Sequence, residues 1–328
     1  MQNDADPKRP ESDHSEVANL PALNDTVEMD ALDIPHIGAQ EPIEIPSVTT
    51  VDCVNGIAAW LTMKSPSRET ENEDSLGVIS ASSDQGILVV ADGLGGHRGG
   101  KNASQALVKS LKKGLPVRKE PVEDRHILIS KGLKVPLQSQ TDQSEVDGLR
   151  SVILNRIEAA NKRLIKSGAG SATTLALVEL QGSKARTYHA GDSQILVMSQ
   201  RGRIKYETVS HSPVGYALEA GVLSEQEAIL HENRHLVSNV IGSRDMSIEL
   251  GPWISLAARD TILLASDGLF DNLFAVEVVE CIRKGSLEDG VHQLAEIAVK
   301  RMCSRIPNLP SKPDDLTILA YRRKPRST

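Results

Sequence analysis

The stretch between residues 86 and 104 constrains the fold more than any other part of the chain. Residues 87–91 form a continuous apolar run, which is typical of a strand buried on both faces. Asp92 follows directly, five glycines lie between positions 93 and 100, and a helical apolar spacing begins at Asn102. A carboxylate at the end of a buried strand, beside a flexible backbone, is a candidate metal ligand. A glycine-rich turn with an incidental aspartate explains this stretch equally well.

A dinucleotide-binding loop has the same order of strand, glycines and helix. Its G-x-G-x-x-G spacing, counted from Gly93, requires glycine at position 98, where the chain has Arg98. Asp92 would also bring a negative charge towards the pyrophosphate that such a loop binds at the helix N-terminus. Both points argue against a nucleotide site.

Composition narrows the class of protein. The 328 residues, 39% of them hydrophobic, suffice for one large domain or two ordinary ones. No run of eighteen apolar residues is present, and the N-terminus lacks the order of a signal peptide, so we predict no membrane segment and a cytoplasmic location. Three widely spaced cysteines fit neither a disulfide framework nor a zinc cluster.

Charge is distributed unevenly along the chain. Residues 1–50 carry eleven acidic and two basic side chains, whereas the whole chain has a net charge of −7, so residues 51–328 have a net charge of +2. With aromatic residues at only 2%, nucleic acid is not a predicted partner. Residues 1–46 are acidic and rich in proline, and we predict a disordered tail there. Residues 114–145 are poorly patterned and are predicted to be a long excursion.

The remaining pattern favours antiparallel sheets covered by helices, because predicted strands follow one another and predicted helices come in pairs. The fold class is therefore α+β. Strands are predicted over 48–63 with a break at 55–56, 76–80, 87–91, 173–180, 185–190, 194–199, 203–209, 261–266 and 316–322. Helices are predicted over 102–113, 146–166, 224–230, 276–284 and 287–304.

Acidic residues recur where predicted strands begin or end. They are Glu73-Asp74, Asp92, Asp192, Asp267 and Asp314-Asp315. One such aspartate is usually a turn former, but several together, without clustered histidines, suggest an oxygen-only site that suits Mg²⁺ or Mn²⁺. Clustered carboxylates repel one another, so such a site is strained without a cation.

Six motifs in this order resemble the PP2C-type (PPM) metal-dependent protein serine/threonine phosphatases in their bacterial form. The motifs are Arg68 with Asn72-Glu73-Asp74-Ser75, the Asp92–His97 run with Gly100 and Ala103-Ser104, Gly170–Thr174, His189–Ser193, Ala265–Leu269 and Asp314–Thr317. The resemblance covers about residues 47–323, and residues 324–328 are left as a basic tail. It implies a four-layer αββα sandwich, in which two antiparallel sheets are flanked by paired antiparallel helices.

The resemblance also implies a site with two Mg²⁺ or Mn²⁺ ions and a third, more loosely held. Asp92 would bridge the pair, with the Gly93 carbonyl as a further ligand. The residues implied to complete the site are Asp267 and Asp314 as ligands, Glu73 and Asp74 holding metal-bound waters, Asp192 at the third ion, and Arg68 and Thr173 as substrate contacts. A water or hydroxide between the two metals would attack the phosphorus of a phosphoserine or phosphothreonine, without a phosphoenzyme.

Some residues depart from the family pattern. Three residues separate Arg68 from Asn72 where two are usual, so Lys64 could take its place at the phosphate. No counterpart of the eukaryotic general-acid histidine is evident, and we expect His97 to be structural. Gln194 stands where arginine is common. Residues 211–236 resemble the flap beside the active site, where substrate selection is expected, although a plain surface excursion explains them nearly as well.

Phosphorylated proteins, the substrates of a serine/threonine kinase, are the partners that the resemblance implies, and a monomer is the expected state. Two other functions stay open. One is a catalytically weak or dead phosphatase-fold module that binds phosphoproteins, which the shifted Arg68 would suit. The other is a hydrolase of small phosphoesters on the same fold.

Overall fold

Two antiparallel sheets form the centre of the molecule. The computed structural model describes residues 43–67, 69–95, 99–115, 143–168, 170–307 and 309–325. The first sheet has the strand order β1 (Thr49–Cys53), β2 (Gly56–Met63), β14 (Leu316–Arg323), β13 (Thr261–Ala265), β9 (Gln194–Met198) and β10 (Ile204–Glu207). The second has the order β11 (Glu249–Leu250), β8 (Lys184–Ala190), β7 (Leu175–Gln181), β4 (Gln85–Ala91) and β3 (Ser75–Ser80), with β12 (Ile254–Ser255) also on β8.

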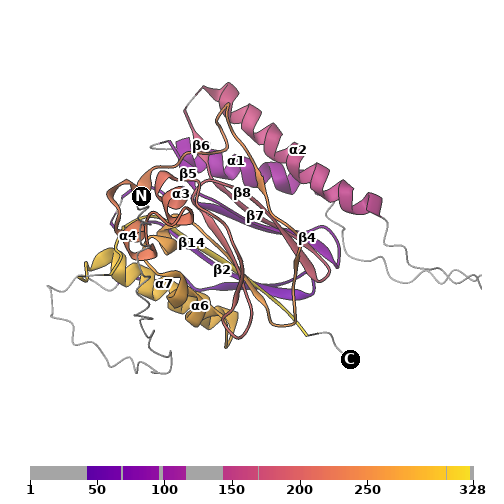
Figure 1. Cartoon of the computed structure of the whole chain (residues 1–328). Helices are drawn as coiled ribbons and strands as arrows, with labels where there is room; N and C mark the ends of the chain where they lie inside the picture. Colours follow the sequence, from indigo (N-terminus) through magenta and orange to yellow (C-terminus); the bar gives the residue numbers. More distant parts are fainter. Residues whose placement is uncertain are drawn as a thin grey trace, which may run out of the picture. The chain divides into compact units, whose positions relative to one another are not determined.

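Helices cover the outer face of each sheet (Figure 1). The pair α1 (Gly99–Gly114) and α2 (Gln143–Ser167) packs on the second sheet, and the pair α6 (Ala275–Ile282) and α7 (Leu287–Cys303) packs on the first. Shorter elements complete the chain. They are β5 (Gly93–Leu94), β6 (Ala172–Thr173), α3 (Pro213–Glu219), α4 (Glu225–Leu230), the 3₁₀ helix η1 (Glu232–His235) and α5 (Asp267–Phe270).

The continuous apolar run of β4 is explained by this layering. Ile87, Val89 and Ala91 pack with α1 and α2, whereas Leu88 and Val90 point to the opposite sheet. All five side chains are fully buried. Successive strand residues face opposite sides, so only a strand between two apolar layers needs apolar residues at every position. The four-layer αββα sandwich predicted from the sequence is confirmed.

One end of the sandwich collects the acidic motifs. Strand β4 ends where β3 begins, with Ala91 opposite Ser75, and β13 ends near the start of β14, with Ala265 opposite Ile318. Ala265 also lies opposite Gln194, the first residue of β9. The turn 191–193 joins β8 of the second sheet to β9 of the first, so it crosses between the sheets at this same end.

The described elements lie within one compact unit, Ile43–Thr328. Most of the tail predicted over 1–46 and of the excursion predicted over 114–145 falls outside the described residues. None of the helices in the part of the chain that the structure describes is long and apolar enough to cross a membrane.

Candidate metal centre

Five aspartates from both sheets converge at this end of the sandwich. They are Asp74 before β3, Asp92 after β4, Asp192 between β8 and β9, Asp267 at the start of α5, and Asp314 before β14. Burial, together with the charges of the other four, raises the pKa of Asp92 well above its ordinary value of 3.8. Such a group of carboxylates is unstable in its ionised form unless cations neutralise it.

Several carboxylate oxygens in this group lack a protein partner. Oδ1 of Asp74, of Asp192 and of Asp267 is buried and has no hydrogen-bond partner among the described residues. Buried polar atoms are normally hydrogen-bonded, so three unpartnered oxygens in one group require a ligand. The donor set consists of hard oxygens, which is what Mg²⁺ and Mn²⁺ prefer. The residues therefore fit the divalent cations that the sequence predicts.

Burial has a similar effect on two further members of the group. Burial raises the pKa of Asp74 to about 8. Hydrogen bonds from the hydroxyls of Ser266 and Thr317 lower this pKa, whereas the charges of Asp315 and Asp267 raise it further. The Ser266 hydroxyl donates to Asp74 Oδ2 over 2.8 Å. Burial and the charge of Asp267 raise the pKa of Asp192 to about 8 as well. Protons and metal ions therefore compete for these carboxylates.

The turn after β4 is held by a close approach of backbones. A Cβ atom placed on Gly93 would lie 2.3 Å from the carbonyl carbon and oxygen of Gly100 and 2.7 Å from the Glu73 carbonyl oxygen. One placed on Gly100 would lie 2.5 Å from the Gly93 carbonyl oxygen and 2.9 Å from Cδ of Glu73. Glycine is thus required at both positions for the Gly93 carbonyl and the Glu73 side chain to approach each other beside Asp92.

Two threonines fix the backbone of Asp92. The Thr173 hydroxyl donates to the Asp92 carbonyl oxygen over 2.8 Å, and the Thr174 backbone N–H donates to the same oxygen over 2.9 Å. In return, the Asp92 N–H donates to the Thr174 hydroxyl over 2.8 Å. Both backbone polar groups of Asp92 are therefore satisfied by Thr173 and Thr174.

Asp314 and its neighbour Asp315 have different surroundings. Both oxygens of Asp315 accept backbone N–H groups, from Ser65 and from Glu73, over 2.7 Å each. Asp315 thereby ties the start of β14 to the segment before β3. The charge of Asp314 is among those that raise the pKa of Asp92.

Lys312 is a cation within this group that the sequence did not reveal. Its Nζ lies 2.5 Å from Oδ2 of Asp267, 2.6 Å from Oδ2 of Asp271 and 3.5 Å from Oδ2 of Asp314. Burial lowers its pKa, but the charges of Asp267 and Asp271 outweigh this effect and raise it. Asn272 fixes the Lys312 backbone, accepting from its N–H over 2.8 Å and donating to its carbonyl over 2.9 Å. The ammonium thus partly neutralises the ligands.

A protein-family comparison identifies this architecture. The model of the protein phosphatase 2C family matches residues 65–297, which span most of the chain and carry all the aspartates above except Asp314 and Asp315. The chain belongs to the protein phosphatase 2C family. The activity of this protein phosphatase is metal-dependent dephosphorylation of proteins, as the motif order predicts.

Relatives of this phosphatase come from several bacteria. The serine/threonine phosphatase stp of Listeria welshimeri is 26% identical over 66% of this chain and 80% of its own length. Protein phosphatase PhpP of Streptococcus pneumoniae is 27% identical over 66% of this chain and 80% of its own length. The crystal structure of Stp1 from Staphylococcus aureus shares the fold, with a TM-score of 0.64 and 23% identity over 87% of this chain and 100% of that one.

Two predicted substrate contacts of this phosphatase need comment. Arg68 lies outside the described residues, as does His97. Thr173 is placed differently from the prediction, because its side chain has no exposed surface and its hydroxyl is donated to the Asp92 carbonyl. These contacts make Thr173 a support of Asp92, and its role as a substrate contact stays a prediction.

A cavity of about 680 Å³ opens beside the aspartates. Asp192, Asp267 and Asp271 line one end, and α3 and α4 of the flap (residues 211–236) line the other. Residues of the predicted flap therefore line the same cavity as Asp192 and Asp267.

Proposed function

We propose that the chain hydrolyses phosphoserine and phosphothreonine in proteins with a pair of Mg²⁺ or Mn²⁺ ions held by Asp92, Asp267 and Asp314. The observation that carries this proposal is the convergence of buried, partly unpartnered carboxylates from both sheets beside an open cavity. Family membership and relatives named serine/threonine phosphatases support the substrate class. The structure of PstP in complex with two manganese ions supports a pair of divalent cations in the proposed mechanism. That structure shares the fold with a TM-score of 0.59 and 21% identity over 82% of this chain and 98% of that one.

Each residue has a defined task in this mechanism. Asp92 and the Gly93 carbonyl would hold the two ions, and Glu73 and Asp74 would hold water molecules beside them. Bound divalent cations would lower the pKa of a water molecule to near neutral and would stabilise negative charge on the phosphoryl oxygens. The Ser266 hydroxyl orients Asp74 for this task, and Lys312 limits the repulsion between ligands before the ions bind.

Further parts of the proposal concern the surroundings of the pair. Asp192 holds a third and weaker ion, and Arg68 binds the phosphate. The substrates are phosphoproteins made by a serine/threonine kinase in the cytoplasm, and the enzyme acts as a monomer. The cavity beside the flap supports a protein substrate, because it offers room for residues next to the phosphorylated side chain.

One assay tests the function against its alternatives. The purified full chain is incubated with p-nitrophenyl phosphate, a phosphothreonine peptide and nucleotides, each with Mn²⁺ or with EDTA. We expect Mn²⁺-dependent release of phosphate from the first two substrates. No turnover on any substrate would leave a binding module, and turnover on nucleotides alone would indicate a small-phosphoester hydrolase.

A further inference from the structure

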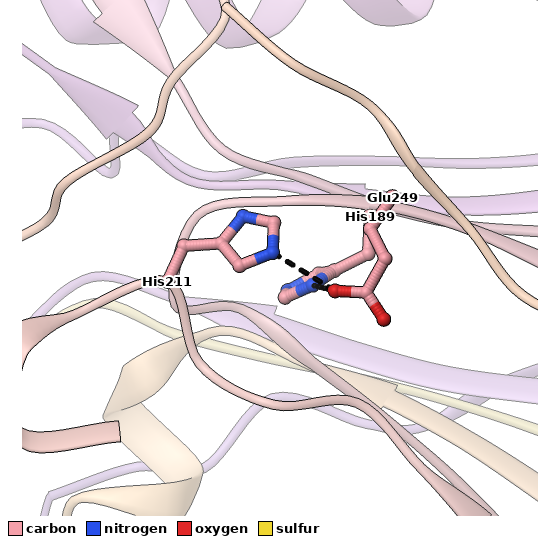
Figure 2. A group of neighbouring side chains, drawn as sticks. All are labelled: His189, His211 and Glu249. Atoms are coloured by element: carbon pink, nitrogen blue, oxygen red, sulfur yellow. Dashed lines mark hydrogen bonds and ion pairs between the residues drawn. The ribbon is translucent and has the colours of Figure 1, made fainter. Parts of the chain in front are cut away.

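Two buried histidines and a glutamate meet beside the Asp192 turn (Figure 2). His189 lies on β8, His211 at the start of the flap and Glu249 on β11. One ligand atom from each lies within 4.8 Å of the other two, so the trio has the composition of a metal site. The hydrogen bonds around it decide whether it can act as one.

The proton on His211 is fixed by its neighbours. Nδ1 of His211 receives the Gly191 N–H over 3.2 Å and the Asn239 Nδ2 group over 2.9 Å. The amide of Asn239 is itself oriented by Ser247, whose N–H donates to Oδ1 and whose carbonyl accepts from Nδ2. Two donors therefore face Nδ1, so the ring proton must be on Nε2, which donates to Glu249 Oε2 over 3.0 Å.

This tautomer is the wrong one for a metal ligand. A cation at Nε2 would displace the proton there and require a proton on Nδ1, where two N–H groups already point. His189 has the same tautomer but turns its other nitrogen to Glu249, because its Nε2 donates to the Ser193 carbonyl over 2.8 Å. Only His211 therefore opposes a metal ion, and Nδ1 of His189 keeps a lone pair. Its Nδ1 has no hydrogen-bond partner among the described residues and lies 4.0 Å from Glu249 Oε2. The trio is thus built to hold hydrogen bonds.

These bonds converge on the turn that carries Asp192. His189 holds the turn on one side of the aspartate through Ser193, and His211 holds it on the other through Gly191. The Ser193 hydroxyl lies 2.7 Å from the Thr174 hydroxyl, which receives the Asp92 N–H. The turns that present the two aspartates are therefore connected through a chain of side chains.

His211 also holds both ends of the flap. Its backbone N–H donates to the Gly191 carbonyl over 2.8 Å, and its carbonyl accepts the Ser238 N–H over 2.8 Å. The side chain of Asn239, just beyond the flap, donates to Nδ1 of the same residue. A displacement of the flap base thus reaches the Asp192 turn through the backbone and the imidazole of one residue, His211.

We propose that His211 is a positioning residue that couples the flap to Asp192, with Glu249 and His189 keeping its imidazole in place. This inference rests on the proposed function, since it takes Asp192 as the ligand of the weaker ion. The Gly191 N–H is buried, and its side-chain acceptor is Nδ1 of His211, so removing that atom leaves this N–H without its side-chain acceptor and weakens the hold on the turn. Groups that orient metal ligands typically change metal affinity by about 10–100-fold when they are lost.

Two substitutions separate the two nitrogens of His211. His211→Asn keeps an acceptor at the position of Nδ1 and removes Nε2. His211→Gln keeps a donor at the position of Nε2 and removes the acceptor. Mn²⁺ binding to each full-length variant is measured by calorimetry, together with the melting temperature and with kcat and KM on a phosphothreonine peptide.

We expect His211→Gln to weaken the weakest Mn²⁺ binding event about 10-fold or more. His211→Asn is expected to stay within about 3-fold of the wild type. The same Gln substitution made in an Asp192→Asn background is expected to add no further loss, because the residue acts through Asp192. If the wild type binds Mn²⁺ but hydrolyses no phosphoprotein, the proposed function is contradicted. The comparison of Mn²⁺ binding between His211→Gln and His211→Asn remains valid in that case.

Three results would overturn the coupling. The first is equal weakening of Mn²⁺ binding by the Asn and Gln variants. The second is a Gln variant that loses melting temperature but binds Mn²⁺ like the wild type. The third is stoichiometric Zn²⁺ binding by the wild type that His211→Asn and Glu249→Gln both abolish, which would make the trio a metal site.

Discussion

Asp314 and Asp315 are adjacent in the chain, and they are expected to respond in opposite ways to the same substitution. Asp315 is 8% exposed and accepts the N–H groups of Ser65 and Glu73 over 2.7 Å each. Asp315→Asn converts one acceptor oxygen into an amide donor, so one of these N–H groups is left facing another donor. A donor left unsatisfied in this way costs about 1–3 kcal/mol, and bonds to a charged acceptor are at the upper end of that range.

The expected loss of stability is therefore about 3 kcal/mol. In a domain of this size, 1 kcal/mol shifts the melting temperature by about 2–4 °C, so Asp315→Asn should lower it by roughly 6–12 °C. Asp314→Asn removes one of the charges that raise the pKa of Asp92, and we expect an unchanged or higher melting temperature without metal. Its Mn²⁺-dependent turnover should fall by about 100-fold or more, equivalent to about 3 kcal/mol of transition-state stabilisation.

Both variants are measured in the same two assays. Thermal unfolding is followed by circular dichroism in EDTA, and turnover of p-nitrophenyl phosphate is followed over a range of Mn²⁺ concentrations at a temperature where both variants are folded. The reverse pattern, with Asp315→Asn stable but inactive and Asp314→Asn active, would refute the assignment of Asp314 as the ligand.

Three further predictions follow from the same geometry. Burial raises the folded-state pKa of Asp74 and Asp192 from 3.8 to about 8. The metal-free protein should therefore lose stability as the pH rises from about 4 to 8, because the folded state opposes the ionisation of these carboxyl groups. Mn²⁺ should raise the melting temperature more at pH 8 than at pH 5, because it binds the ionised groups. Gly93→Ala should abolish Mn²⁺-dependent turnover, because its Cβ would lie 2.3 Å from the Gly100 carbonyl. Gly148→Ala is the control and should leave turnover unchanged, because a Cβ at this position meets no atom within 4 Å. Thr173→Val should weaken Mn²⁺ binding in calorimetry by about 10-fold, whereas a substrate contact would instead raise the KM for the phosphopeptide.

Local patterns were sufficient to predict antiparallel sheets covered by helices, whereas the family resemblance implied the four layers. The apolar run before Asp92 required a strand between two apolar layers, and the structure places it there. Ser224 and Glu227 predicted a capping box, and both of its hydrogen bonds are present at the start of α4. These features are decided by neighbours in sequence, which is why they could be found without the structure.

Features decided by distant residues were not found. Helix α5 is four residues long, too short for a helical period, so Asp267 was interpreted as the end of a strand and Asp271 was overlooked. The spacing of four residues between these two aspartates was the available signal. Lys312 has no local pattern at all, because its role depends on carboxylates 41 and 45 residues away. Helix α3 was missed although Ser212 and Pro213 are a common start, because Gly215 weakens the helical pattern.

The turn 191–193 crosses from one sheet to the other. Because of this crossing, we expect the packing of the apolar core between the sheets to influence which metal ion binds. The proposed ligands come from both sheets, and the apolar layer between the sheets contains Leu88, Val90, Val197 and Leu264. Mg²⁺ accepts ligands only within about 0.1 Å of its preferred distance, whereas larger cations tolerate more. We therefore expect a methylene removed from this layer to change which cation the enzyme prefers, although no ligand is altered.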